Sequence, residues 1–305
     1  FLGTLRVGVL RSDNTSRCNL LFMTRFHPIK AYRGPKGKPV FQHNHGFVDQ
    51  KVEVACGQCG GCRKQRAEMW AVRCVHEASL KSENCFVTLT YRKLPAGGSL
   101  NIEDWQNFAK RLRHARGSFR YFQCGEYGEL NWRPHHHALL FGISFADRVL
   151  LKGEGAKALY TSPSLEQIWS HGYVTLGSVT WASAVYCASY ILKKVTGKAA
   201  EKYYGHRRPP YVTMSRNPGL GADWIKKWKD DVYSDDSIVI EGRQHRPPRF
   251  YDERLSQEEL LSVKVRRRAA VAEAAESLSH ERLQAKESIY NSRLEMKPRY
   301  GGYVE

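Results

Sequence analysis

Runs of apolar residues, and the alternation of apolar with polar positions, predict that strands form the middle of this chain. Residues 85–91 combine β-branched and aromatic side chains with alternating threonines, a pattern typical of a strand. Residues 133–142 open with charge and three consecutive histidines and continue as an apolar run, which indicates a buried strand. A turn over residues 125–131 precedes it and predicts a hairpin. Further strands are predicted at residues 52–55, 119–124 and 173–180.

Apolar residues at helical spacing predict helices at residues 63–80, 101–116, 182–195 and 256–294. In the second of these, Trp105, Phe108 and Leu112 share one face. Ser256 and Glu259 form a capping-box pattern at the start of the last helix, whose apolar stripe is thin. The segments between these elements are predicted to be a loop at 28–46, a connector at 144–165 and an extended linker at 246–251.

These changes in pattern divide the chain into five predicted segments. Residues 1–22 precede Met23, the first methionine, and are expected to be a non-native leader. They are followed by a Cys-rich segment with a helix (23–81), a strand-rich core (82–200), a basic and aromatic extension (201–251) and a helical tail (252–305).

The charge balance predicts a polyanionic partner. The 305 residues carry 48 Lys and Arg against 30 Asp and Glu, a formal charge of +18. Nucleic acid is the first expectation and an anionic membrane surface the second. A hydrophobic content of 42% argues for a folded protein, and no apolar run approaches the roughly 18 residues of a membrane span.

Three of the eight cysteines have the spacing of metal ligands. Cys56, Cys59 and Cys62 are separated by two residues each, with glycines between them, and such thiolates can wrap a zinc ion or an iron–sulfur cluster. A structural zinc needs a fourth ligand, for which His43 and His45 are candidates; Cys74 would lie about 18 Å along the helix from Cys62. The alternative is a turn that starts the helix and binds nothing.

The histidine strand contains a candidate metal site. Because side chains alternate along a strand, His135 and His137 share one face and His136 points to the other. Two imidazoles about 7 Å apart on one face can hold a cation. The hairpin brings a carboxylate, Glu126 or Glu129, near them, which predicts a divalent-metal site with open positions. The alternative is a histidine-rich turn on a surface hairpin.

The helix at 182–195 places two phenols on one face. Tyr186, Tyr190 and Lys194 are each four residues apart, and Lys193 lies on the same side. A tyrosine stripe is often core, and lysines suit a helix C-terminus. Beside a metal site, however, a phenol can become a nucleophile, because a nearby cation favours the phenolate.

These motifs together resemble a known family. His135–His137 with the apolar run, and Tyr186 and Tyr190 followed by two lysines, resemble the motifs of the HUH endonucleases, which initiate rolling-circle replication. The cysteine cluster, the strand at 86–91 and the segment 124–128 resemble the replication initiators of gokushovirus-type Microviridae. The middle position of the histidine motif is normally hydrophobic and is His136 here.

The resemblance implies an α+β fold with an HUH core. It implies a central five-stranded antiparallel sheet with flanking helices, to which the Cys-rich N-terminal segment and a C-terminal helix are added. It also implies Mg²⁺ or Mn²⁺ on His135, His137 and an acidic residue, for which Glu126 is preferred to Glu129. The tyrosines would nick single-stranded DNA at the viral origin, Tyr190 first and Tyr186 in closing, leaving a 5′-phosphotyrosine and a 3′-OH primer.

The expected surroundings follow from this activity. A host polymerase and helicase would be partners in the host bacterial cytoplasm, without a membrane. Aromatic and basic residues suit single-stranded DNA, and the predicted contacts are Arg63, Arg66, Tyr203, Tyr204, Arg207 and Arg208. The alternatives are a plasmid-mobilising relaxase, in which the histidines usually follow the tyrosine, and a non-enzymatic nucleic-acid binder built on the cysteines.

Overall fold

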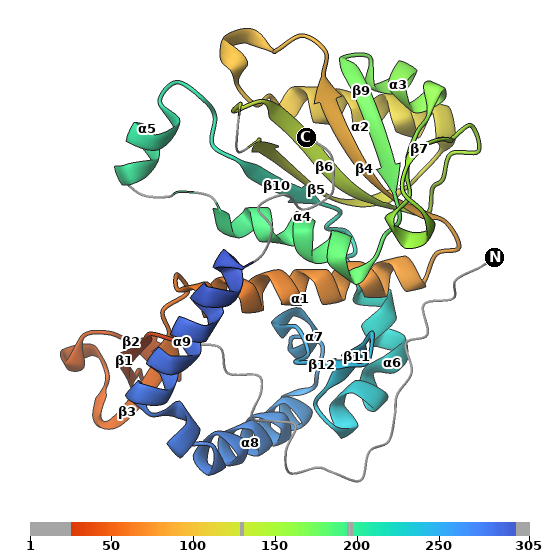
Figure 1. Ribbon diagram of the computed structural model, residues 1–305. Helices are drawn as coiled ribbons and strands as arrows, with labels where there is room; N and C mark the ends of the chain where they lie inside the picture. The colour runs from red at the N-terminus through yellow and green to blue at the C-terminus, as the bar shows by residue number, and fades with distance from the viewer. Residues whose placement is uncertain (1–25, 129–130, 194, 196–197, 297–305) are drawn as a thin grey trace. The chain divides into compact units, whose positions relative to one another are not determined.

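A seven-stranded antiparallel sheet is the main element of the computed structural model, which describes residues 26–128, 131–193, 195 and 198–296 (Figure 1). It belongs to the first of two structural units, Ala67–Arg254. The second unit combines residues 26–66 with residues 255–296. The fold is therefore α+β, as expected.

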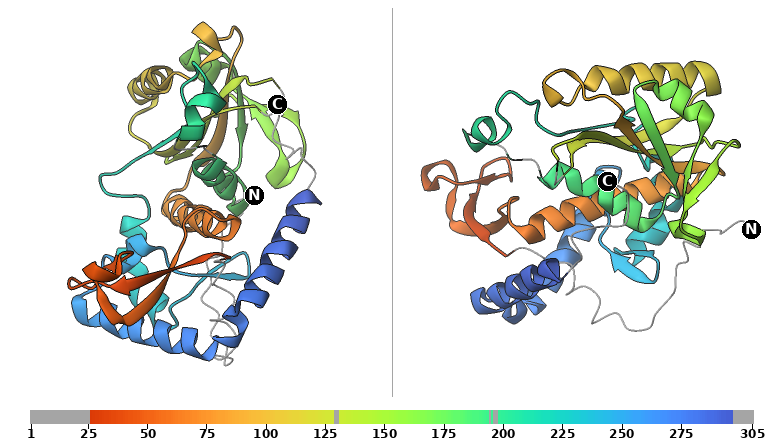
Figure 2. Two further views of the ribbon diagram at one scale, coloured as in Figure 1. Left: turned by 90° about the vertical axis from the view of Figure 1, so that its left-hand side faces the viewer. Right: turned by 45° about the horizontal axis from the view of Figure 1, so that its top comes forward.

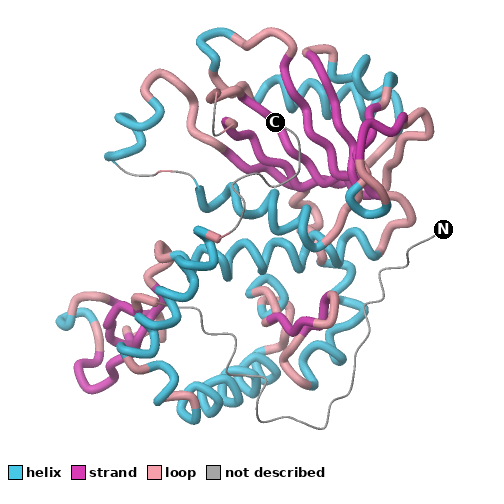
Figure 3. The backbone as a smooth tube through the Cα atoms, in the orientation of Figure 1, coloured by secondary structure: helices cyan, strands magenta, loops and turns pink. Residues whose placement is uncertain are grey.

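The strands of the large sheet lie side by side in an order that differs from their order in the chain (Figure 3). They are β10 (Tyr211–Met214), β5 (Arg120–Tyr127), β6 (Pro134–Phe141), β4 (Asn84–Tyr91), β9 (Gly172–Gly177), β8 (Leu159–Thr161) and β7 (Val149–Lys152). The predicted strands at 85–91, 119–124 and after Arg133 are confirmed, as is the β5–β6 hairpin.

The sheet has seven strands where the resemblance implied five. Residues 144–165, predicted to be a connector, contribute β7 and β8, and Tyr160 of β8 pairs with Leu176 of β9. All of β7 is exposed. Such short edge strands are held by backbone hydrogen bonds, so no alternation of side chains reveals them.

Strand β6 lies between β5 and β4, which explains why all of Pro134–Phe141 is buried. In this register His137 lies opposite Thr88 of β4 and Cys124 of β5. His135 lies opposite Thr90 and Glu126. The hairpin therefore brings the carboxylate of Glu126 to the histidine strand, as predicted.

Helices cover both faces of the sheet (Figure 2). On one face α2 (Ile102–Arg116) and α3 (Pro163–Trp169) enclose a core that contains Trp105, Phe108, Leu140 and Trp169. Burying each such side chain contributes roughly 1.5–3 kcal/mol. On the other face lies α4 (Trp181–Lys193), the predicted tyrosine helix. The sheet thus has an apolar face and a face reserved for the histidines and tyrosines.

The predicted extension at 201–251 also contributes to the first unit. Its further elements are α5 (Lys198–Tyr204), α6 (Ala222–Ser234), β11 (Ile238–Ile240), β12 (Arg243–His245) and α7 (Arg249–Asp252). Short 3₁₀ turns occur at Ala96–Gly98 and Gly155–Lys157. The linker prediction at 246–251 was wrong at its end: the two prolines are extended, but Pro248 is the N-cap of α7.

The second unit contains a small sheet and two helices. Its elements are β1 (Pro28–Arg33), β2 (Pro39–Val40), a 3₁₀ turn (His43–His45), β3 (Phe47–Ala55), α8 (Gln257–Glu273), a 3₁₀ turn (Glu276–Leu278) and α9 (His280–Glu295). The loop prediction at 28–46 was wrong because β1 pairs with β3 there. The predicted capping box of Ser256 is confirmed, but the single helix at 256–294 is interrupted, since Ser279 caps a new helix.

Helix α1 (Gly60–Ser79) belongs to the second unit up to Arg66 and to the first from Ala67. None of the described helices combines the length and the apolar character that a membrane crossing requires. The predicted leader, residues 1–22, lies outside the described residues.

Candidate active site

His135 and His137 lie on the face of the sheet that α4 covers. Their ring centroids are 6.1 Å apart and their planes lie within 10° of parallel. Both are buried, with 7% and 3% of their surface exposed. The predicted alternation along the strand is therefore confirmed.

Glu126 completes a cluster with the two histidines. Its carboxylate Oε1 lies 2.8 Å from His137 Nε2, and its side chain is almost fully buried. A buried charge requires such a partner. Glu129, the alternative third ligand, lies outside the described residues.

Thr88 orients the His137 ring and was not identified from the sequence. Its Oγ1 lies 2.9 Å from His137 Nδ1. When Nε2–H donates to the Glu126 carboxylate, Nδ1 accepts from the threonine hydroxyl; when Nε2 is a metal ligand, the same hydroxyl can accept from Nδ1–H. The alternating threonines of β4 were visible in the sequence, but only the register shows that this one meets His137.

The electrostatics of His135 suit a ligand. Burial, and then the neighbouring His137, lower the pKa of His135 to about 4. The imidazole is therefore neutral at pH 7, and a metal ligand must be neutral to offer its lone pair.

The cluster fits a divalent cation by its donor types, two imidazoles and a carboxylate. Among the described residues, though, only a cysteine group has three ligand atoms all within 4.8 Å of one another. His137 and Glu126 are hydrogen-bonded directly to each other. A cation would have to replace this hydrogen bond, and the side chains would have to rotate toward it.

Both tyrosines of α4 face His137. Tyr186 Oη lies 3.4 Å from His137 Nε2, and the Tyr190 ring stacks on the imidazole with centroids 5.8 Å apart. The two phenol rings are 5.0 Å apart and nearly perpendicular. The spacing of four residues thus places them on one face of the helix, as predicted, and the fold brings that face to the histidines.

The surroundings of the phenols favour their neutral form. Burial, and then the negative charge of Glu126, raise the pKa of both Tyr186 and Tyr190 far above the usual value. The sequence analysis expected neighbours that favour the phenolate. The predicted cations Lys193 and Lys194 lie where the structure does not describe side chains.

His136 has a different environment on the opposite face of the sheet. Its Nε2 lies 2.9 Å from the Tyr91 hydroxyl, which itself donates to Asp104 at 2.8 Å. Its Nδ1 accepts from Gln123 and Tyr211, each at 3.3 Å. Burial, together with its histidine neighbours, lowers the pKa of His136 to about 3. This third histidine is a neutral structural residue.

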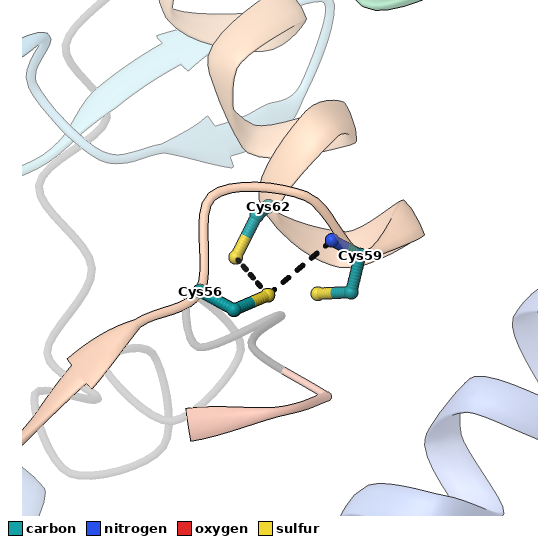
Figure 4. A group of neighbouring side chains, drawn as sticks. All are labelled: Cys56, Cys59 and Cys62. Atoms are coloured by element: carbon teal, nitrogen blue, oxygen red, sulfur yellow. Dashed lines mark hydrogen bonds between the residues drawn. The ribbon is translucent and has the colours of Figure 1, made fainter. Parts of the chain in front are cut away.

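The three predicted cysteine ligands lie together at the start of α1, forming what is called the thiol cluster below (Figure 4). Cys56 Sγ and Cys62 Sγ are 3.9 Å apart, and the backbone N–H of Cys59 donates to Cys56 Sγ at 3.3 Å. Burial acts to raise the pKa of Cys59, but hydrogen bonds from the backbone of Cys62 and Phe26 outweigh it and lower the pKa to about 7. The cluster could bind a metal such as zinc.

No fourth His, Cys, Asp or Glu among the described residues completes the thiol cluster within 4.8 Å. The two candidates His43 and His45 lie in a 3₁₀ turn and are not part of it. Cys74 is fully buried within the first unit and does not join it, as the length of the helix predicted.

The predicted DNA contacts have different environments. Arg66 donates to the Gly57 carbonyl at 3.3 Å beside the thiol cluster, and Arg63 lies in the same first turns of α1. Tyr204 is buried, whereas Tyr203 is 54% exposed. Arg208 pairs with Glu103 at 3.0 Å. The fourth arginine, Arg207, lies over the ring of Trp132.

Comparison with known proteins relates this chain to phage replication. Residues 84–195 match the family model of the replication-associated protein ORF2. The chain is 31% identical to Replication-associated protein VP4 of Bdellovibrio phage phiMH2K over 239 residues, covering 74% of this chain and 75% of the relative. It is 30% identical to Replication-associated protein ORF2 of Spiroplasma virus 4, covering 77% and 81%. Replication-associated protein ORF4 of Chlamydia phage 1 is 29% identical, covering 69% and 55%. No solved structure matches the chain.

Proposed function

The chain belongs to the Microviridae-type replication-associated proteins of phages, and on that premise we propose that it initiates replication by nicking single-stranded DNA at the viral origin. The observation that supports this most strongly is the meeting of two phenols with a buried histidine–carboxylate cluster on one face of the sheet. The proposed fold is an HUH-type core around β6.

The proposed reaction is a transesterification with a tyrosine as the nucleophile. The Tyr190 Oη–P bond forms while the bond between phosphorus and O3′ breaks, and the DNA 5′ end becomes a phosphotyrosine. The phenol proton passes to the carboxylate of Glu126, which is hydrogen-bonded to Tyr190. The departing O3′ takes up a proton and becomes a free 3′-OH. Because an ester replaces an ester, a later hydroxyl can reverse the step.

Mg²⁺ or Mn²⁺ would be held by His135, His137 and Glu126, with Thr88 orienting His137. When bound, this ion supplies a Lewis acid that polarises a phosphoryl oxygen and favours the phenolate. Lys193 and Lys194, at the end of α4, are proposed to act on the same developing charge.

The two tyrosines are proposed to act in sequence. The hydrogen bond to Glu126 gives Tyr190 a base, so it makes the first attack. Tyr186, one turn away, attacks in the closing step while the first ester is still in place. The free 3′-OH would prime a host polymerase, with a host helicase opening the duplex, in the host bacterial cytoplasm.

A labelled single-stranded origin oligonucleotide tests the proposal. With Mn²⁺ or Mg²⁺ we expect a covalent protein–DNA adduct that Tyr190→Phe reduces at least a hundredfold and that Tyr186→Phe/Tyr190→Phe abolishes, since phenylalanine has no nucleophile; removal of one catalytic group costs about this order. Tyr160→Phe is the matched control, because its ring packs against the core on the other side. Metal-independent binding without any adduct would instead indicate a non-enzymatic binder.

We also propose that the thiol cluster holds one Zn²⁺ per chain. Metal analysis of the purified protein is expected to give one zinc, and Cys59→Ser is expected to remove it, because two thiolates bind zinc far more weakly than three. Cys85→Ala, a buried cysteine of β4 outside the cluster, is the control and should keep the metal. Iron with sulfide in the wild type, or no metal at all, would contradict a zinc site.

A further inference from the structure

Aromatic rings gather at the turn of the β5–β6 hairpin, close to the start of the histidine strand. The Trp132 and Tyr203 rings are 5.4 Å apart, and the Arg207 guanidinium lies 5.2 Å from the Trp132 centroid. Trp132 is half-buried and Tyr203 is 54% exposed. These three side chains are called the aromatic platform. An exposed tyrosine beside a tryptophan and an arginine offers the ring faces on which a nucleobase stacks.

The hairpin holds Trp132 in place. Its backbone is left-handed, with φ 50°, and its N–H donates to the Gly128 carbonyl at 3.1 Å. Below it lies the Tyr127 ring, with centroids 5.7 Å apart. The Tyr127 hydroxyl donates to the Arg208 carbonyl and accepts from the Leu100 N–H. A ring anchored in this way loses little further freedom when a ligand stacks on it.

The structure separates the predicted DNA contacts of this region into two groups. Tyr204 and Arg208 serve the fold: the Tyr204 hydroxyl accepts from the Val195 N–H, and Arg208 pairs with Glu103. Arg207 makes no ion pair with a carboxylate in the described part of the chain, and its Nε is buried without a hydrogen-bond partner. Arg207 and Tyr203 are therefore the ones available to a ligand.

The platform is close to the site of the proposed reaction. Trp132 precedes His135 by three residues, which is at most about 10 Å of chain. A Cβ placed on Gly128, the residue that accepts from Trp132, would lie 3.3 Å from His135 Cε1. A strand whose phosphate reaches the histidine pair would thus bring a neighbouring base to the platform.

We propose that the aromatic platform binds an unstacked nucleobase of the single-stranded substrate, a few nucleotides from the phosphate that is cut. This inference rests on the proposed function and adds to it the way the substrate is held. Trp132 and Tyr203 stack on the base, and Arg207 contributes positive charge toward a phosphate. Stacking is tolerant of base identity, so the platform positions the strand and does not read its sequence.

Fluorescence anisotropy with a labelled oligothymidylate, in EDTA so that no cleavage occurs, tests the platform. Trp132→Asn is expected to weaken binding about tenfold, the order of one lost base–ring stack; asparagine suits the left-handed backbone and lacks the ring. Trp228→Asn is the matched control, because Trp228 on α6 is also exposed, at 38%, with Lys227 Nζ 5.1 Å from its ring. The control should bind as the wild type does, and equal melting temperatures would show that both variants fold.

An oligonucleotide with abasic positions distinguishes stacking from charge. Removing the bases should weaken wild-type binding by about the same factor as Trp132→Asn, and the two changes together should cost no more than either alone. Arg207→Gln should reduce the salt slope by about 0.7, the share of one phosphate contact on a single strand.

If Trp132→Asn binds oligothymidylate as the wild type does, the platform proposal is wrong. The covalent adduct assay is a separate measurement. An adduct with unchanged binding would leave the nickase standing without the platform. A tenfold binding loss without any adduct would retain the platform and remove the nickase.

Discussion

At the scale of single residues, histidines with one side-chain chemistry have different roles according to their burial and partners. His137 contacts a carboxylate, a threonine and two phenols at the candidate active site. His76 is buried elsewhere in the first unit, where its Nδ1 lies 2.8 Å from the Tyr251 hydroxyl and its ring stacks on Trp224 at 3.4 Å. A ring enclosed by aromatic neighbours is neutral and structural.

The burial of His76 predicts a pH dependence of stability. Burial, and next the neighbouring His245, hold the pKa of His76 well below its usual value. The unfolded chain therefore binds a proton that the folded chain does not, and the free energy of unfolding falls as pH drops below about 6.5, by about 1.4 kcal/mol per pH unit for this residue. Urea denaturation between pH 7 and pH 5 measures the slope.

His76→Gln should flatten this slope, because glutamine does not titrate. His114→Gln is the control, since His114 is exposed on α2, and it should keep the wild-type slope. The same slope in wild type and His76→Gln would show that other groups cause the pH dependence.

At the scale of elements, the position of Thr88 depends on how closely β4 and β9 approach. Gly172 begins β9 and pairs with Tyr91 of β4. A Cβ at this position would lie 2.3 Å from Arg92 N and 2.4 Å from Thr90 O, both backbone atoms. Only glycine allows this approach.

Gly172→Ala is expected to lower the free energy of unfolding by about 2 kcal/mol or more, because backbone atoms cannot move aside as a side chain can. Gly177→Ala, at the other end of β9, is the control: its new Cβ would meet the flexible Leu159 side chain at 3.3 Å. Urea denaturation gives both values. A Gly172→Ala protein as stable as the control would contradict the close packing of the two strands.

At the scale of the whole molecule, the formal charge of +18 should govern how strongly any nucleic acid binds. Positive charges that neutralise phosphates release counterions, so the affinity falls as salt rises. The charge acts on single-stranded DNA whatever its sequence, whereas the candidate active site acts on one phosphate.

The affinity for single-stranded DNA should therefore depend steeply on salt. If about five phosphates are neutralised, the slope of log affinity against log salt is about −3.5, and a fourfold rise in salt weakens binding about a hundredfold. Anisotropy titrations from 50 to 200 mM salt measure this. An uncharged-backbone oligonucleotide is the control and should show almost no slope; a flat response of normal DNA would mean that the excess charge has another purpose.

Local patterns in the sequence predicted the parts of the site that depend on one element. Strand alternation placed His135 and His137 on one face, helical spacing placed Tyr186 and Tyr190 together, and the cysteine spacing predicted the thiol cluster. These predictions succeed because the periods of the strand and the helix are properties of the backbone and do not depend on what packs against it.

Only the tertiary structure decided which elements face each other. The register of β4 on β6 brings Thr88 to His137, the packing of α4 brings the phenols to the imidazoles, and the hairpin turn brings Trp132 to Tyr203. The edge strands β7 and β8 and the strand β10 were likewise missed, because main-chain pairing leaves little trace in side-chain order. Such contacts join residues far apart in the chain, and the sequence alone does not encode their distances.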